Sequence, residues 1–213
     1  MADLTFFLNS DAAAAHDCAY SAYWENTSAA VRHTLTTSRG TSAATITPCT
    51  RTNGQHLGIG CQLVSAAIAT GRTWTTSDTI DFVIMCQDYA ESGSSTLALS
   101  IRVFNAAGDT VIGTLYEGVI NNVNWISGYR SRHNDGVAVQ NTVVMPDNGH
   151  IVVEIGFHDP FAATFSNRLI IGEMSGGPLL LSDDQTDVDL YPWLAFTYGA
   201  PAGVNVALTG VCG

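Results

Sequence analysis

The amino-acid sequence predicts an all-β chain, folded as a single domain over residues 1–213 into a two-sheet antiparallel jelly roll or β-sandwich. Several segments alternate apolar and polar residues with a period of two, which is the pattern of strands. Glycine, asparagine, aspartate and serine cluster between these segments at close spacing, as in sandwiches and barrels. The chain has 213 residues, of which 46% are hydrophobic and 13% charged. It is therefore long enough to bury a sizeable core.

The first predicted strand covers residues 4–8, where apolar residues alternate. We expect residues 1–15 to form an extended N-terminal arm, which would add a strand to the sheet edge of a neighbouring protein. The side chains expected at this interface are Leu4, Phe6, Phe7 and Leu8. The alanine-rich residues 11–20 predict one or two helical turns.

The clearest strands are predicted at residues 56–68, 79–86, 96–104 and 150–158. In the third of these, Leu97, Leu99, Ile101 and Val103 share one face, and Ser100 and Arg102 share the other. Such alternation indicates one buried face and one face in water. Turns are predicted by glycine, asparagine and aspartate at residues 91–95, 105–109, 134–136 and 146–149.

The charge balance excludes some partners. Eight basic residues, all arginines, face 19 acidic residues, which gives a net charge of −11. Affinity for nucleic acid comes mostly from cations that displace phosphate counterions, and the sequence has no cluster of basic residues. We therefore expect no direct binding to nucleic acid or to an anionic membrane surface.

The cysteines and the N-terminus indicate where the chain is made. Five cysteines are widely spaced without a Cys-x-x-Cys motif: Cys18, Cys49, Cys61, Cys86 and Cys212. An odd number at such spacing favours buried free thiols over disulfides or a zinc site. Residues 1–10 lack the positive region of a signal peptide, and no stretch approaches the roughly 18 apolar residues of a membrane span. We expect synthesis in the cytoplasm without a signal peptide.

Three residues occur in the chain order of a serine-protease triad. The segment around His16 and the Gly-rich segment around Ser175 resemble the histidine and serine boxes of chymotrypsin-type proteases, and Asp81 lies between them. However, only 15 residues precede His16, Asp17 is inserted after it, and Met174 precedes the serine where an aspartate should stand. We therefore expect no enzyme activity and no catalytic residue, and a serine hydrolase stays a remote alternative.

A metal site is also not expected. His150, Glu154 and His158 lie on one side of a predicted strand, but positions four apart on a strand are separated by about 13 Å. One ion with ligands about 2.1 Å away cannot bridge them. The polar face that these residues form is expected to meet water or another subunit. The acidic loop at residues 182–189 lacks the glycine and distal glutamate of a calcium-binding loop, and we expect it to be solvated.

A contact loop is predicted at residues 121–133. Asparagine, tryptophan, tyrosine and arginine are typical of recognition surfaces. The candidate binding residues are Trp125, Tyr129, Arg130 and Arg132. This loop carries the alternative of a glycan-binding or receptor-binding module. No phosphate-binding loop is present, since the Gly-x-x-x-x-Gly-Lys motif requires a lysine, and we expect no cofactor.

Four segments resemble small jelly-roll structural proteins of tailed bacteriophages. These segments are residues 71–74, 99–108, 167–173 and 189–196, and the resemblance spans about 125 residues in order and texture rather than in one diagnostic motif. It implies a virion component, most simply a capsid decoration (cement) protein on the outer surface of the phage head. Its expected partners are the major capsid protein or other virion proteins, with further copies of itself in a homo-oligomer. A tail-tip or fibre module is the alternative.

Overall fold

The computed structural model describes thirteen strands and no helix within residues 4–8, 13–14, 16–28, 30–38, 45–51, 54–69, 71–87, 95–124, 130–161, 165–172 and 192–197. The strands are β1 (Leu4–Leu8), β2 (Val31–Thr36), β3 (Thr45–Arg51), β4 (Leu57–Ser65), β5 (Arg72–Trp74), β6 (Thr79–Gln87), β7 (Thr96–Phe104), β8 (Val111–Asn124), β9 (Arg130–Ala138), β10 (Val143–Met145), β11 (His150–His158), β12 (Phe165–Ile171) and β13 (Trp193–Thr197). The prediction of an all-β chain is confirmed. Within these ranges, no helix is long and apolar enough to cross a bilayer.

Eleven of the described strands form one continuous sheet. Its order is β3-β12-β6-β13-β1-β2-β4-β11-β7-β8, with β9 on the other edge of β6, while β5 and β10 form a separate pair. All described pairs are antiparallel except β2 and β4. A parallel pair needs a long crossover, and here β3 and its flanking segments lie between the two strands in sequence. The prediction of a purely antiparallel fold was therefore wrong, because the large sheet is mixed.

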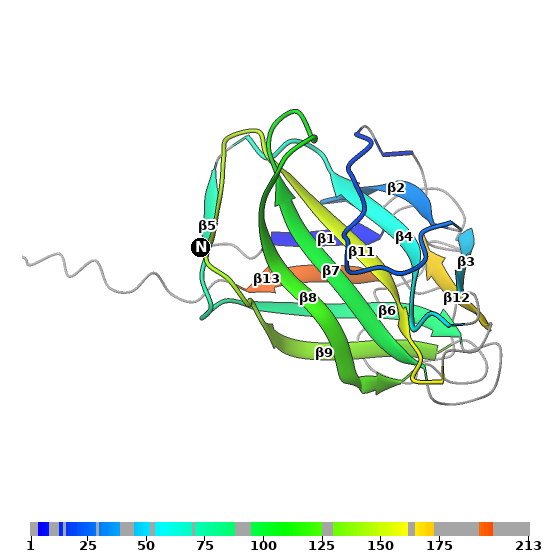
Figure 1. Ribbon diagram of the computed structural model, residues 1–213. Coiled ribbons are helices and arrows are strands. Elements are labelled where there is room, and N and C mark those ends of the chain that lie inside the picture. Colours follow the sequence, from blue (N-terminus) through cyan, green and yellow to red (C-terminus); the bar gives the residue numbers. More distant parts are fainter. Residues whose placement is uncertain are drawn as a thin grey trace, which may run out of the picture.

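The sheet curls so that its two halves face each other. In Figure 1, β1, β13, β6 and β9 lie in one layer, and β4, β11, β7 and β8 lie in the layer in front of it. One apolar cluster fills the space between the layers. It includes Phe6, Phe82 and Phe196 from the first layer, and Leu63, Leu99, Ile101, Val153 and Phe157 from the second. Alternate residues on each strand supply it, as the period of two requires.

Several predicted elements have the observed bounds. β7 and β11 match residues 96–104 and 150–158. The turn after β7 contains Gly108 at a φ of 73°, and the turn before β11 contains Asn148 at a φ of 61°, where few other residue types are tolerated. Residues 134–136 are not a turn, which corrects that prediction. They form a bulge in β9, with Gly136 at a φ of 72° and its N–H donating to Asp81 Oδ1 at 2.6 Å.

The N-terminal strand does not form a free arm. β1 pairs with β13 along one edge and with β2 along the other, so it lies inside its own sheet. Phe6 and Leu8 are 1% and 0% exposed, because their side chains belong to the core. The interface predicted for Leu4, Phe6, Phe7 and Leu8 is thus made within the chain. Residues 16–28 contain no helix, which corrects the prediction of helical turns within 11–20.

Candidate functional site: a buried polar layer

A row of polar side chains crosses the outer face of four strands. The register places Glu154 on β11 opposite Gln62 on β4 and opposite Ser100 on β7. Ser100 in turn is opposite Glu117 on β8. Cross-strand partners share one face, so these four side chains project away from the apolar core. Arg102 projects from the same face, two residues along β7.

This outer face is buried. Gln62, Glu154 and Ser100 are all 0% exposed, which corrects the expectation that the polar face of each strand meets water. The cover is a segment of the same chain, residues 16–28, called here the strap. The strap has no regular secondary structure and crosses the front layer, as the dark blue trace in Figure 1 shows. Both faces of β4, β7 and β11 are therefore packed.

Apolar contacts hold the strap down on either side of the polar row. Cys18 packs in a cluster with Val64, Phe104 and Val152. Trp24 packs in a second cluster with Ile59 and Ala98. Gly156 makes room for this ring, because an added Cβ there would lie 2.7 Å from the Trp24 ring and 2.1 Å from the Gly58 carbonyl oxygen.

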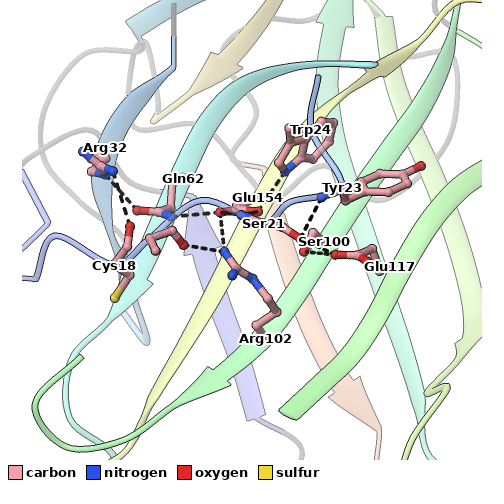
Figure 2. Close-up of polar contacts among 11 residues, drawn as sticks. Cys18, Ser21, Tyr23, Trp24, Arg32, Gln62, Ser100, Arg102, Glu117 and Glu154 are labelled. Atoms are coloured by element: carbon pink, nitrogen blue, oxygen red, sulfur yellow. Dashed lines mark hydrogen bonds and ion pairs between the residues drawn. The ribbon is translucent and has the colours of Figure 1, made fainter. Parts of the chain in front are cut away.

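Glu154 is the centre of the polar contacts (Figure 2). Its Oε1 accepts from Arg102 Nη2 at 2.6 Å and from Gln62 Nε2 at 2.9 Å. Its Oε2 accepts from Trp24 Nε1 at 2.8 Å, and the Ser21 N–H lies 3.2 Å from both oxygens. A carboxylate offers about four acceptor positions, so these donors satisfy it. Two of them, Ser21 and Trp24, belong to the strap.

Arg102 and Glu117 extend the contacts to either side. Arg102 Nη2 also donates to the Ala19 carbonyl oxygen in the strap at 2.7 Å, and its side chain is 6% exposed. Its Nε is buried and finds no acceptor in the described part of the chain. Glu117 accepts from the Ser21 hydroxyl and, at 3.2 Å, from the Ser100 hydroxyl. The described polar contacts that join the strap to the row are therefore made by side chains of the strands.

An outer shell of contacts joins the strap to β2. Arg32 Nε donates to Gln62 Oε1 at 2.9 Å, and Arg32 Nη1 forms an ion pair with Asp17 at 2.6 Å. The Arg32 guanidinium also lies 4.2 Å from the centre of the Tyr20 ring. This is a favourable cation–π geometry. The Asp17 side chain is 83% exposed, so its ion pair lies at the water boundary.

Burial shifts the titration of the groups beneath and within the strap. It raises the pKa of Cys18, although Arg102 and Arg32 oppose the shift. Burial, with smaller contributions from Tyr116 and Glu117, raises the pKa of Tyr23 to about 12. Desolvation disfavours the charged form, so these groups are neutral near pH 7. The thiol of Cys18 is therefore held in the form that is not nucleophilic.

The arrangement works chemically as an anchor. The Glu154 carboxylate is enclosed by donors from two strands, β4 and β7, and from the strap. Removing any one partner would leave a buried polar group unsatisfied, which is costly. The layer thus fixes the position of the strap over the sheet.

His150, Glu154 and His158, the three residues weighed and rejected as a metal site, lie on this same face, and the structure separates them. Glu154 lies in the anchor, while His150 sits under His16, with ring centres 4.2 Å apart. His158 stacks with His56 at 6.1 Å near the other end of β11. No group of three metal-ligating side chains occurs among the residues that the structure describes. The described cysteines, Cys18, Cys49, Cys61 and Cys86, are buried and free, as predicted.

The residues of the hydrolase alternative are not brought together. His16 lies on the outer face of the front layer, against His150 and Gly108. Asp81 projects from the outer face of the other layer, between the core residues Ile80 and Phe82, and accepts from Gly136. The apolar core therefore separates the two. Ser175 lies outside the described residues.

The predicted contact loop is described only in part. Trp125 and Tyr129 lie outside the described residues, as does the acidic loop, and of Arg130 only the backbone in β9 is described. Arg132 is 6% exposed and donates to the Ser131 carbonyl oxygen at 3.0 Å. Its strand partner is Ile84, which points into the core. The prediction of a surface contact was wrong for Arg132.

Sequence reasoning missed the strap residues Ser21 and Trp24 and the role of Gln62. One signal was present. Each of β4, β7 and β11 carries one long polar or charged side chain in an otherwise apolar or small-residue interior: Gln62, Arg102 and Glu154. A single such residue on a strand is typical of a position with a specific partner.

Comparisons with known proteins do not identify a family. No family model matches the chain, and no curated protein matches it. Among solved structures, a CocE/NonD family hydrolase from Staphylococcus aureus aligns with 93% of this chain and 34% of its own, at a TM-score of 0.34 and 10% identity. A structure of infectious bursal disease virus, Gx strain, aligns with 76% of this chain and 38% of its own, at a TM-score of 0.24 and 13% identity. The chain thus spans about a third of the length of the proteins it is compared with, and the likeness is too weak to indicate a function.

Proposed function

We propose that this chain is a structural component of a virus particle, a decoration protein that binds the outer surface of a phage head and stabilises it. The observation that carries the proposal is the set of hydrogen bonds around Glu154. The Glu154 side chain is 0% exposed, and it accepts hydrogen bonds from two strands and from two residues of the strap. The polar layer thus serves the rigidity of the domain, and contact with partners falls to the exterior.

The charge of the exterior supports a position away from the packaged genome. Among the residues whose side chains the structure describes, four acidic ones are exposed: Asp17, Glu25, Asp109 and Asp147. By contrast, the described arginine side chains are all buried or half-buried: Arg32, Arg72, Arg102, Arg132 and Arg168. A negative exterior is repelled by DNA phosphates and suits the outside of a shell. In this proposal the chain is made in the host cytoplasm and joins the particle there.

A contact surface for the major capsid protein is best sought at β8 and β10. Val111, Ile112 and Val144 are 42%, 44% and 62% exposed, and they are among the few large apolar side chains on the described exterior. The two strands adjoin, since an added Cβ at Gly113 would lie 2.9 Å from Val143. Apolar side chains at such a surface supply the core of an interface.

The copy number of the chain per particle tests the proposal. Quantitative mass spectrometry of particles from the genome that encodes the chain should give hundreds of copies, in fixed ratio to the major capsid protein. Three or six copies would place the chain in the tail and favour the receptor-binding alternative. Its absence from particles would overturn both.

A binding assay on heads that lack the chain tests the contact surface. Ile112→Asp should reduce binding at least tenfold, since a charge in an apolar interface must be desolvated. Phe161→Asp is the matched control, because Phe161 is 71% exposed but lies beyond the opposite end of the sheet. Equal binding by both variants would exclude the β8 and β10 surface.

A further inference from the structure

Two histidines meet at the wall of a cavity beside the start of the strap. The cavity has a volume of about 360 Å³, and its lining includes His16 of the strap, His150 of β11, and Asn148 in the turn before β11. The rings of His16 and His150 lie 4.2 Å apart, centre to centre, at an angle of 53°. His150 is 2% exposed, whereas His16 is half-buried. The fold thus brings together two imidazoles that are far apart in the sequence.

Both ring nitrogens of His150 face main-chain carbonyl oxygens. Nδ1 lies 2.9 Å from the Ser65 oxygen, and Nε2 lies 3.3 Å from the Ala106 oxygen. A neutral imidazole carries one N–H, so only one of these contacts is a hydrogen bond, and the shorter distance identifies Nδ1 as the donor. Nε2 then presents its lone pair to the Ala106 oxygen. Two electron-rich atoms that face each other in this way are stabilised by a cation bound to both.

The Ala106 oxygen and His150 Nε2 have the spacing of two ligands of one ion. If each ligand lies about 2.1 Å from the ion, their separation of 3.3 Å corresponds to an angle of about 104° at the ion, close to tetrahedral. The hydrogen bond from Nδ1 to the Ser65 oxygen is also typical of a metal-binding histidine. It fixes the tautomer and the orientation of the ring, and it leaves Nε2 as the ligand.

His16 is in position to supply a further ligand. Within the described residues, neither nitrogen of its ring has a hydrogen-bond partner. The ring packs against the turn after β7, where an added Cβ at Gly108 would lie 2.9 Å from the His16 Cγ. The same turn carries Ala106. The two histidines and the carbonyl oxygen therefore converge from the strap, from β11 and from the turn between β7 and β8.

The surroundings favour a transition-metal ion over Ca²⁺ or Mg²⁺. No lining residue of the cavity is charged. The two carboxylates next to lining residues in sequence have other partners: Asp17 pairs with Arg32 at 2.6 Å, and Asp147 accepts from the Gly71 N–H at 2.6 Å. Imidazole ligands without a carboxylate suit Zn²⁺, Cu²⁺ or Ni²⁺, and a near-tetrahedral angle favours Zn²⁺ among these.

We propose that His16, His150 and the Ala106 carbonyl oxygen bind a Zn²⁺ ion, with water in the fourth position. The ion joins the first residue of the strap to β11 and to the turn after β7. It fixes the N-terminal end of the strap, as Glu154 fixes its middle through Ser21 and Trp24. This inference does not depend on the proposed function.

Calorimetric titration of Zn²⁺ into the full chain tests the proposal, with metal first removed by a chelator and the thiols kept reduced. His16→Gln should weaken Zn²⁺ binding about tenfold or more, because it removes a ligand. His56→Gln is the matched control, since His56 stacks with His158 at the other end of β11, with ring centres 6.1 Å apart. This control should bind Zn²⁺ as tightly as the natural chain does.

Two further measurements separate loss of a ligand from a change in the fold. Zn²⁺ should raise the midpoint of thermal unfolding of the natural chain and of His56→Gln, because it binds the folded state, and His16→Gln should lack this rise. In nuclear magnetic resonance spectra of the natural chain, Zn²⁺ should shift the ring signals of two of the six histidines.

Two results would overturn the proposal. Equal Zn²⁺ affinity in His16→Gln and the natural chain would assign the binding to other groups, such as the cysteines. Absence of Zn²⁺ binding to the natural chain would leave His150 as a doubly protonated ring that donates to both carbonyl oxygens.

Discussion

The two faces of β4, β7 and β11 are both buried, but by different means. The inner face presents apolar side chains such as Leu63, Ile101 and Val153 to the core. The outer face presents Gln62, Arg102 and Glu154 to the strap. Apolar burial is proportional to area and has no direction, whereas hydrogen bonds and ion pairs require defined partners.

This difference assigns separate tasks to the two faces. The inner face supplies most of the driving force for folding, and similar side chains can replace one another there at modest cost. The outer face positions one particular segment, and its polar groups depend on one another. The variants described next compare the loss of stability on the inner face with the loss on the outer face, or the losses at different positions of the polar layer.

The largest effect is expected for Glu154→Ala. It leaves the Arg102 guanidinium buried without a counter-charge, and the free energy of unfolding should fall by about 3 to 5 kcal/mol, measured by urea denaturation. The adjacent inner-face variant Ile155→Val removes one methylene and should cost about 0.5 to 1.5 kcal/mol.

A double variant sharpens this result. Glu154→Met combined with Arg102→Met replaces both charges by apolar side chains and should be more stable than either single variant. If the loss of stability in the double variant equals the sum of the losses in the two single variants, the two charges are not coupled and the polar side chains do not depend on one another.

A smaller effect is expected for Trp24→Phe. The ring still packs on Ile59 and Ala98, but the indole N–H that donates to Glu154 at 2.8 Å is lost. A hydrogen bond to a charged group contributes about 1.5 to 3 kcal/mol, and thermal or urea unfolding should show a loss of this size. Tyr23→Phe is the neighbouring control and should change stability near pH 7 by less than about 0.5 kcal/mol.

The decrease in the free energy of unfolding at alkaline pH should depend in part on Tyr23. Its pKa is about 12 in the folded chain and about 10 when unfolded, so its contribution is fully present below pH 10 and is lost as the pH rises to about 12. Because the side chain is only half-buried, solvent screening limits this contribution to about 1 kcal/mol. When the free energy of unfolding is measured between pH 9 and 12, its decrease with pH should be less steep in Tyr23→Phe than in the natural chain. An unchanged slope would assign the loss to other tyrosines.

The smallest effect is expected at the rim of the layer. Asp17→Asn removes the exposed ion pair to Arg32 and should change stability by less than about 0.5 kcal/mol, with even less effect in 1 M salt. A loss above about 1.5 kcal/mol would show that the two ion pairs of the layer are equivalent, contrary to their burial.

The strands were more predictable than the way they assemble. The bounds of β7 and β11 followed from alternation, because each strand has apolar residues at every second position and ends at a turn. The turn at Asn148 followed from residue types that tolerate a positive φ. The parallel pairing of β2 with β4 could not follow, since strand patterns carry no direction.

The strap was missed because its signal is not periodic. Residues 16–28 have neither helical nor strand spacing, and their burial depends on Glu154, more than 120 residues away in sequence. The outer face was expected to be exposed to water because its side chains are polar. A polar side chain on a strand requires hydrogen-bond partners, and either water or another segment of the chain can provide them.

The position of β13 sets the order in which the sheet can be completed. It lies between β1 and β6, whose edges it joins, yet it is the last described strand in the chain. At about 5 to 20 residues per second, a ribosome needs about 10 to 40 seconds to pass from β1 to β13. Throughout that interval the facing edges of β1 and β6 lack their permanent partner. Newly made chains are therefore exposed to mispairing with one another, and a chaperone that shields these edges would raise the yield of folded protein.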